Sequence, residues 1–194
     1  LEGFRAPNDG RLNLLLGHGE VAKAGEYLVF FEEDIEKSNL HYVALGHVHR
    51  PWQTKIGQTL LVQNGSVEGH GFDEPGEKGV FLVEISENGG AARQIPLPGS
   101  RCVPVSLDVT ALCALPEPEK AAAEEAIRRA EAVCPQERAF LRLELTGTGE
   151  ISEQKIRQHL DGFLAVKLIN AARPPVSPFA KAGEDSLTGL FVRT

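Results

Sequence analysis

Two apolar runs in the first fifty residues each end at a glycine that is followed by a histidine. Residues 12–16 precede Gly17-His18-Gly19, and residues 42–45 precede Gly46-His47-Val48-His49. Short apolar runs bounded by turn residues are typical of buried strands, and glycine allows the backbone to turn out of a strand. We therefore predict two buried strands that each deliver histidine side chains to the place where the strand ends.

The positions between these runs favour a helix over residues 26–38. Four apolar side chains suit one face of that helix: Phe30, Phe31, Ile35 and Leu40. A strand, a helix and a strand within about 30 residues fit a βαβ unit, whose parallel strands end at the same edge of a sheet. Ligands of open α/β layers bind beyond the carboxyl ends of the strands. We therefore expect His18, His47 and His49 at one edge.

The rest of the chain predicts two further groups of elements. A first domain covers residues 1–97. Short strands separated by glycine-rich turns complete this domain, and we predict them over residues 54–55, 59–62, 80–85 and 91–97. A β-α-β-α-β pattern then predicts a small α+β domain over residues 98–170. Its strands are expected over 102–109, 140–145 and 163–169, and its helices over 119–133 and 152–160. Residues 171–194 form a proline-rich tail or linker. The predicted fold class is therefore α/β (α+β).

Composition narrows the function classes. The 194 residues are 42% hydrophobic and 24% charged, which is typical of a globular protein, and the net charge is −7. An acidic chain binds nucleic acid poorly through charge alone. No apolar run is long enough to span a bilayer, and we expect no signal peptide. The three cysteines match no zinc or disulfide spacing, which predicts reduced thiols and a cytoplasmic protein.

The histidines are the main candidates for functional residues. In extended backbone, residues i and i+2 point the same way, so His47 and His49 can face one spot. Imidazole is the commonest neutral metal ligand. A lone His-x-His pattern is more often a surface or packing feature, but the strand-glycine context at both sites favours metal ligands at His18, His47 and His49. Arg50 and His70 are candidate substrate-binding residues, with a solvated loop histidine as the alternative for His70.

Four segments together carry a family resemblance: residues 14–19, residues 42–49, Asn64-Gly65-Ser66 and Gly76-Glu77-Lys78-Gly79-Val80. They resemble the last motifs of calcineurin-like metallophosphoesterases, and among these the SbcD-type DNA-repair exonucleases. The resemblance covers residues 12–97 by motif and extends more weakly over 100–170. It implies the C-terminal portion of a metallophosphoesterase β-sandwich layer with a flanking helix, followed by a capping domain that shapes the DNA groove.

The resemblance also implies a chemistry and partners. Two divalent ions, usually Mn²⁺, cut a phosphodiester: His18 and His47 would bind one ion, and His49 the other. The ions clamp the phosphate and lower the pKa of bound water. The implied partners are DNA and an SbcC-type coiled-coil ATPase, docked in part through a C-terminal tail. A homodimer is a further expectation.

The family's early motifs are missing before His18. These are Asp-x-His, Gly-Asp and Gly-Asn-His, which supply the bridging carboxylate, an asparagine ligand and the catalytic histidine. The chain also has no methionine and begins with Leu1. We therefore expect a piece of a longer metal-dependent phosphodiesterase, inactive alone, with its catalytic residues upstream. Two alternatives stay open: a calcineurin-like phosphatase or phosphodiesterase of a small substrate, and a non-catalytic binding or scaffold module.

We expect the in-frame coding DNA upstream of the Leu1 codon to encode Asp-x-His, Gly-Asp and Gly-Asn-His in that order. Three neutral histidines hold two divalent ions poorly, so these motifs must supply the missing oxygen ligands. Sequencing that DNA tests the expectation. A start codon near Leu1 with no such motifs would contradict the nuclease interpretation and favour a binding module.

Overall fold

The computed structural model describes residues 1–22 and 29–175. The chain divides into two compact units, Leu1–Cys102 and Val103–Thr194. The predicted mixed α/β class is confirmed. The roles expected for the two domains, and the boundaries drawn from sequence, stay predictions. Most of the predicted tail over 171–194 lies outside the described residues.

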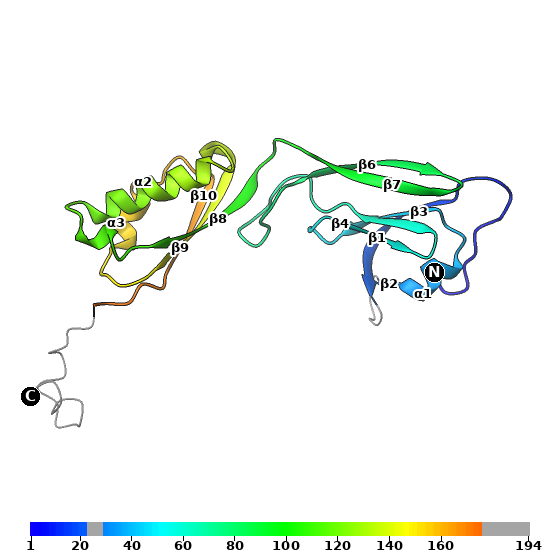
Figure 1. Cartoon of the computed structure of the whole chain (residues 1–194), viewed down its shortest axis with the longest axis horizontal. Coiled ribbons are helices and arrows are strands. Elements are labelled where there is room, and N and C mark those ends of the chain that lie inside the picture. The colour runs from blue at the N-terminus through cyan, green and yellow to red at the C-terminus, as the bar shows by residue number, and fades with distance from the viewer. Residues whose placement is uncertain (23–28, 176–194) are drawn as a thin grey trace, which may run out of the picture. The chain divides into compact units, whose positions relative to one another are not determined.

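The first unit contains a five-stranded sheet in the order β2-β1-β3-β5-β4 (Figure 1). Its strands are β1 Leu14–Ala22, β2 Val29–Phe31, β3 Tyr42–His47, β4 Trp52–Ile56 and β5 Thr59–Gln63. β1 and β3 pair in parallel, as the βαβ pattern predicts, and β3 pairs in parallel with β5. β5 follows β4 through a turn at Gly57, whose φ is +58°, and the two strands pair antiparallel. The strands that carry His18 and His47 are therefore neighbours.

The prediction of a helix over residues 26–38 is wrong at residues 29–31. Val29–Phe31 forms β2, which pairs in parallel with Glu20 to Ala22 at the end of β1. Only Glu32–Lys37 forms the helix, α1, and residues 26–28 lie outside the described part. β-branched and aromatic residues favour strands, whereas Glu32, Glu33 and Asp34 suit the positive end of a helix. Pattern alone did not separate these two preferences.

β1 differs from its prediction in two ways. It does not break at Gly17-His18-Gly19 but continues to Ala22, so His18 lies within the strand. The expected burial also fails on one face, because Leu14 and Leu16 are exposed, Leu16 by 82%. Side chains alternate along a strand, so Leu14, Leu16 and His18 share that face. The opposite face packs into the first core, which includes Ile35, Val43, Leu45 and Leu61.

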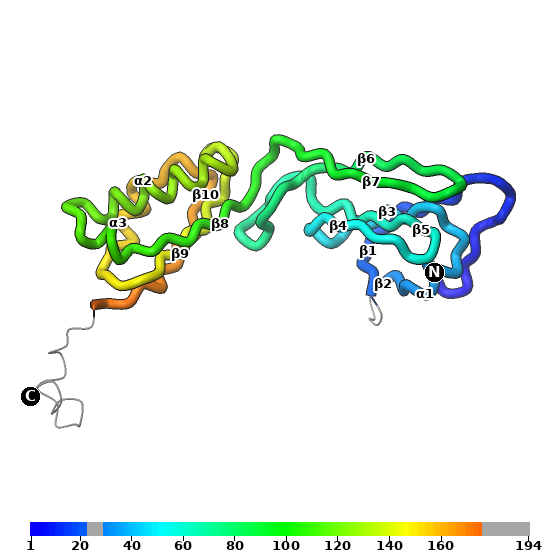
Figure 2. Tube along the Cα trace, in the orientation of Figure 1, coloured from blue at the N-terminus to red at the C-terminus, as the bar shows by residue number. Residues whose placement is uncertain are grey.

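The first unit also contains a long hairpin. β6 Gly79–Ser86 and β7 Gly89–Pro96 pair antiparallel over their full length (Figure 1). Both strands predicted here, over 80–85 and 91–97, therefore form, and the turn between them consists of Glu87 and Asn88. The tube in Figure 2 shows the chain entering β6 from the loop that follows β5. That loop, residues 64–78, carries His70.

The second unit has the predicted β-α-β-α-β order. Its main elements are β8 Arg101–Asp108, α2 Pro118–Glu131, β9 Ala139–Thr146, α3 Glu153–Arg157 and β10 Ala165–Asn170. Short 3₁₀ turns lie at Leu112–Ala114 and Gln136–Arg138. The strand order is β10-β9-β8, so β9 is central. Among the described residues, no helix is long and apolar enough to cross a membrane.

The core of the second unit forms between β9 and α2. Leu141, Leu143 and Leu145 are fully buried on one face of β9, as their alternation predicts. Four alanines of α2 pack in the same cluster: Ala122, Ala123, Ala126 and Ala130. Val133, the last residue of the helix predicted over 119–133, is exposed because α2 ends at Glu131. Ser152 caps α3 by accepting a hydrogen bond from the Lys155 backbone N–H.

Leu143→Ala should lower the free energy of unfolding by about 2–5 kcal/mol, because it empties a fully buried site in the central strand. Urea unfolding of the purified chain measures this. Arg142→Ala is the matched control, since the neighbouring side chain is exposed and should cost less than about 0.5 kcal/mol. Equal losses for the two variants would contradict the assigned core face.

Candidate metal site

Parallel pairing brings the backbones of His18 and His47 close together. His18 lies opposite Gly46 in the β1–β3 register, and His47 is the last residue of β3. The centres of the two imidazole rings are 5.2 Å apart, with the planes inclined at 70°. Two imidazoles that bind one tetrahedral metal ion have ring centres about 5 Å apart. The pair therefore has the separation that a shared ion requires.

Gly46 lets the His18 ring lie against the backbone of β3. A Cβ atom at Gly46 would lie 3.3 Å from His18 Nδ1. The amide of the fully buried Gln63 adds a brace on the same strands, since its Nε2 donates to the carbonyls of Gly19 and Gly46 at 3.3 and 2.9 Å. The backbone beside both histidines is therefore held by three neighbouring strands.

His47 has an unusual backbone conformation. Its φ is +102°, and in the described residues only one other non-glycine residue, Asn39, has a positive φ. Asparagine adopts such angles with little strain, whereas histidine does so less readily. Strained backbone of this kind concentrates at functional sites, where the surrounding structure maintains it. The strain is consistent with a side chain that is kept for its chemistry.

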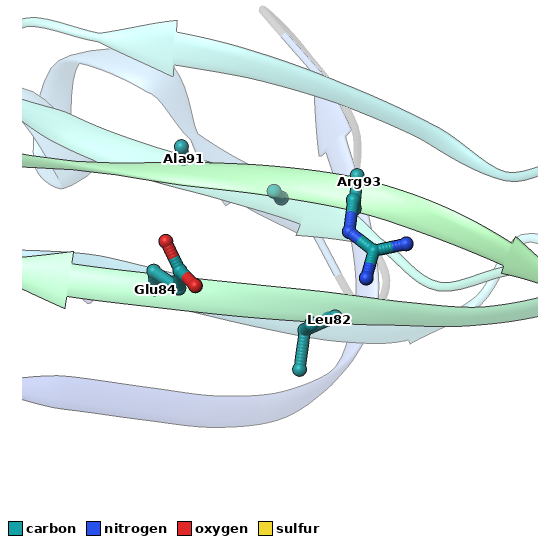
Figure 3. A pocket seen from close by; sticks show the side chains of 5 residues that line it. Leu82, Glu84, Ala91 and Arg93 are labelled. Carbon is teal, nitrogen blue, oxygen red and sulfur yellow. The ribbon is translucent and has the colours of Figure 1, made fainter.

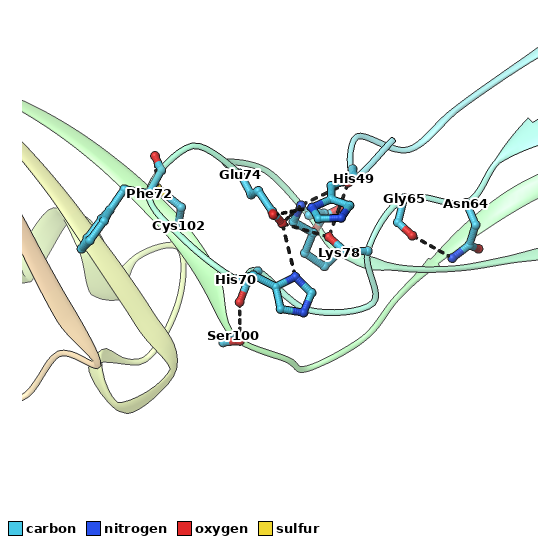
Figure 4. Close-up of polar contacts among 12 residues, drawn as sticks. His49, Asn64, Gly65, His70, Phe72, Glu74, Lys78, Ser100 and Cys102 are labelled. Atoms are coloured by element: carbon cyan, nitrogen blue, oxygen red, sulfur yellow. Dashed lines mark hydrogen bonds and ion pairs between the residues drawn. The ribbon is translucent and has the colours of Figure 1, made fainter. Parts of the chain in front are cut away.

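His49 belongs to a different group of side chains. β3 ends at His47 and His49 lies in a bend, so strand alternation does not position it. Its ring centre is 5.7 Å from that of His70. Its Nδ1 lies 2.6 Å from Oε1 of Glu74 (Figure 4). The structure thus pairs His18 with His47, and His49 with His70.

Glu74 is the residue that the sequence reasoning missed. Within the described residues, His49, His70 and Glu74 are one group whose ligand atoms all lie within 4.8 Å of one another. Glu74 stands in a charged, glycine-rich loop, and nothing local distinguishes it from Asp73 or Glu77. The spacing of four residues from His70 to Glu74 and from Glu74 to Lys78 is the one signal that the sequence offers.

Glu74 is ionised at neutral pH. Burial raises the pKa of its carboxyl, but hydrogen bonds from His49, Lys78 and Ser66 outweigh this effect and lower the pKa to about 2. The Lys78 side chain is only 3% exposed, and its Nζ lies 3.1 Å from Glu74 Oε2. A buried ammonium needs such a partner, because an uncompensated charge in the interior is strongly destabilising.

Arg50 lies beside an open pocket of about 880 Å³ that is also lined by His49, Asp73, Glu74 and Glu77. Three carboxylates against one guanidinium make the lining attractive to cations and unfavourable for a bare phosphate. A smaller pocket of about 120 Å³ lies on the β6–β7 hairpin between Glu84 and Arg93 (Figure 3). It holds one carboxylate and no histidine, so the larger pocket is the candidate site.

The comparisons with known proteins agree with this chemistry at the level of a superfamily. No family model matches the chain. Over 86 residues, 43% of the chain, it is 26% identical to "Uncharacterized metallophosphoesterase YhaO" of Bacillus subtilis (strain 168), and the match covers 21% of that protein. The similarity supports the metallophosphoesterase part of the resemblance, over a span that covers about a fifth of that protein's length. The histidine and carboxylate donors described above fit a divalent cation.

Gly65→Ala should destabilise the chain more than Gly10→Ala. Both glycines have a similar positive φ, +74° and +78°, so both substitutions meet the same backbone penalty of about 1–2 kcal/mol. Only at Gly65 would the new Cβ also lie 2.8 Å from Pro51 N and 3.0 Å from the His49 carbonyl oxygen, whereas nothing lies within 4 Å at Gly10. Urea unfolding of both variants measures the difference. Equal losses would contradict the tight packing around His49.

Proposed function

We propose that this chain supplies the late metal ligands of a two-metal phosphodiesterase that cuts DNA in DNA repair. The observation that carries the proposal is the approach of the His18 and His47 rings to 5.2 Å on two neighbouring parallel strands. The similarity to a metallophosphoesterase supports the coarser part of it. Exonuclease action and the SbcD-type subfamily are the finer part, and they rest on the sequence resemblance.

His18 and His47 would hold one ion through their imidazole nitrogens, and His49 would contribute to the second. When bound, two divalent ions, in our proposal Mn²⁺, neutralise phosphate charge and supply a hydroxide nucleophile. Three neutral ligands do not balance two dications, so carboxylates must come from elsewhere in the whole protein. For this reason we propose that the catalytic residues lie upstream and that this chain alone is inactive.

Arg50 and His70 are the proposed substrate contacts. Both side chains are exposed beside the group that contains His49 and Glu74. Arg50 is the one basic side chain among the residues that line the large pocket. A guanidinium binds phosphate oxygens in pairs, so Arg50 suits a backbone phosphate once metal ions offset the neighbouring carboxylates.

The wider assignments extend the same proposal. The second unit is the capping domain, and the partners are DNA, an SbcC-type coiled-coil ATPase and a second copy of the protein in a homodimer. The proposed location is the cytoplasm. Since the match covers only 21% of its relative, these are proposals about the whole protein.

One observation favours a second candidate, a phosphatase or phosphodiesterase of a small substrate. Asp73, Glu74 and Glu77 make the pocket beside His49 acidic, which is unfavourable for a long polyanion. Mn²⁺-dependent assays of the whole protein separate the two candidates. Cleavage of linear duplex DNA supports the nuclease, whereas cleavage of a chromogenic phosphodiester without cleavage of DNA favours the small-substrate enzyme.

His18→Asn and His47→Asn should each weaken Zn²⁺ binding to the 194-residue chain by at least about tenfold, because each removes one imidazole from a shared ion. Zn²⁺ is the probe because imidazole prefers it to Mn²⁺. Isothermal titration calorimetry measures the affinity.

His159→Asn is the control, since His159 is an exposed histidine of the second unit. Its affinity for Zn²⁺ should equal that of the unaltered chain. Unchanged affinity in both the His18 and the His47 variants would contradict the metal site and favour a non-catalytic binding or scaffold module.

A further inference from the structure

Both carboxylate oxygens of Glu74 are engaged within the protein. Oε1 lies 2.6 Å from His49 Nδ1, and Oε2 accepts from Ser66 Oγ and Lys78 Nζ, each at 3.1 Å. The side chain is only 12% exposed. Figure 4 shows the carboxylate lying between His49 and Lys78. Glu74 is therefore fixed in position by polar contacts on both sides.

The same side chains also hold the backbone of His49. Its carbonyl oxygen accepts a hydrogen bond from the Ser66 N–H at 3.2 Å and from Lys78 Nζ at 3.3 Å. Lys78 thus contacts the backbone of His49 and the carboxylate that holds the His49 ring. Because no strand supports His49, these contacts determine where its imidazole points.

We propose that Glu74 is a positioning residue that makes Nε2 the metal-binding nitrogen of His49. An ionised carboxylate only accepts hydrogen bonds, so the partner nitrogen, Nδ1, must carry the proton. In neutral imidazole the other nitrogen, Nε2, then keeps its lone pair available for a metal ion. This inference rests on the proposed role of His49 as a metal ligand.

The competing interpretation makes Glu74 itself a ligand, with His49 and His70. Two observations oppose it. Oε2 already accepts two hydrogen bonds, from Ser66 and Lys78, so a cation bound there would displace one of them. It would also lie close to the buried Lys78 ammonium, and two like charges at short range repel strongly where water is excluded. The position of Lys78 therefore favours the positioning role.

The first test measures the proton on His49 in the absence of metal. Removing Glu74 alone would leave Lys78 buried without a partner, so Lys78→Met is the reference variant, and Glu74→Leu/Lys78→Met replaces the pair by apolar groups of similar size. ¹⁵N chemical shifts of the His49 ring, recorded in alkaline buffer where imidazole is neutral, report which nitrogen is protonated. We expect the Nδ1–H form in the reference and its loss in the double variant.

Glu74→Gln/Lys78→Met is the conservative rescue. Its amide oxygen can still accept from Nδ1–H, so it should restore part of the Nδ1–H population. A merely structural role for Glu74 would not move the tautomer. The same tautomer in the reference and in Glu74→Leu/Lys78→Met, with both folded by circular dichroism, would overturn the proposal.

The second test uses calorimetry to measure the Zn²⁺ affinity of the site to which His49 contributes, separately from that of the His18–His47 pair. Relative to Lys78→Met, the Glu74→Leu/Lys78→Met variant should bind about 10–100-fold more weakly, as is typical when the partner that orients a ligating histidine is lost. His70→Asn should leave the affinity unchanged. A comparable loss in His70→Asn would overturn the proposal in favour of a direct site formed by His49, His70 and Glu74.

His49→Asn separates the inference from the function on which it rests. If this variant binds Zn²⁺ as tightly as the unaltered chain, His49 is not a ligand and that part of the proposed function fails. The tautomer series requires no metal, so it decides by itself whether Glu74 orients the ring.

Discussion

The parallel register between β1 and β3 is the constraint on which the candidate site depends. Six consecutive pairs, from Leu14 with Tyr42 to Gly19 with His47, align the two Gly-His segments. A slip of one residue would turn His18 to the opposite face of the sheet, since side chains alternate along a strand. Gln63 braces this register from β5 by donating to a carbonyl on each of the two strands. The imidazole pair therefore depends on this backbone pairing and also on the positive φ of His47, because regular alternation along β3 would place His47 on the face of Val43 and Leu45, opposite His18.

His49 is positioned by a second and different principle. Its place in the molecule depends on charge, because the loop after β5 returns to it with Ser66, Glu74 and Lys78. The interior position of Lys78 requires a carboxylate nearby, and that requirement places Glu74 against the imidazole. The candidate metal ligands thus combine a rigid pair on neighbouring strands with a third group held by an ion pair. Displacing either Glu74 or Lys78 would leave the other without its partner.

Local patterns predicted most of the fold, and the failures lie where local information ends. The alternation of Leu141, Leu143 and Leu145 identified a strand correctly, since neighbours in sequence decide it. Phe30 and Phe31 suit a helix face and a strand equally well, and the pairing of β2 with β1 decides between them. Leu16 was expected to be buried because it is apolar, but burial depends on what covers a face. Glu74 became visible only when a loop brought it 2.6 Å from a residue 25 positions away.

The positive φ of His47 has a consequence for how this sequence responds to selection. Histidine in this conformation carries strain of about 1–3 kcal/mol, whereas glycine would adopt the same backbone without it. Stability alone therefore favours losing the imidazole. A screen for thermal resistance in the laboratory would therefore tend to remove the side chain on which the chemistry depends. Stability and activity oppose each other at this single residue, and homologues that have lost their chemistry are the ones in which we expect glycine there.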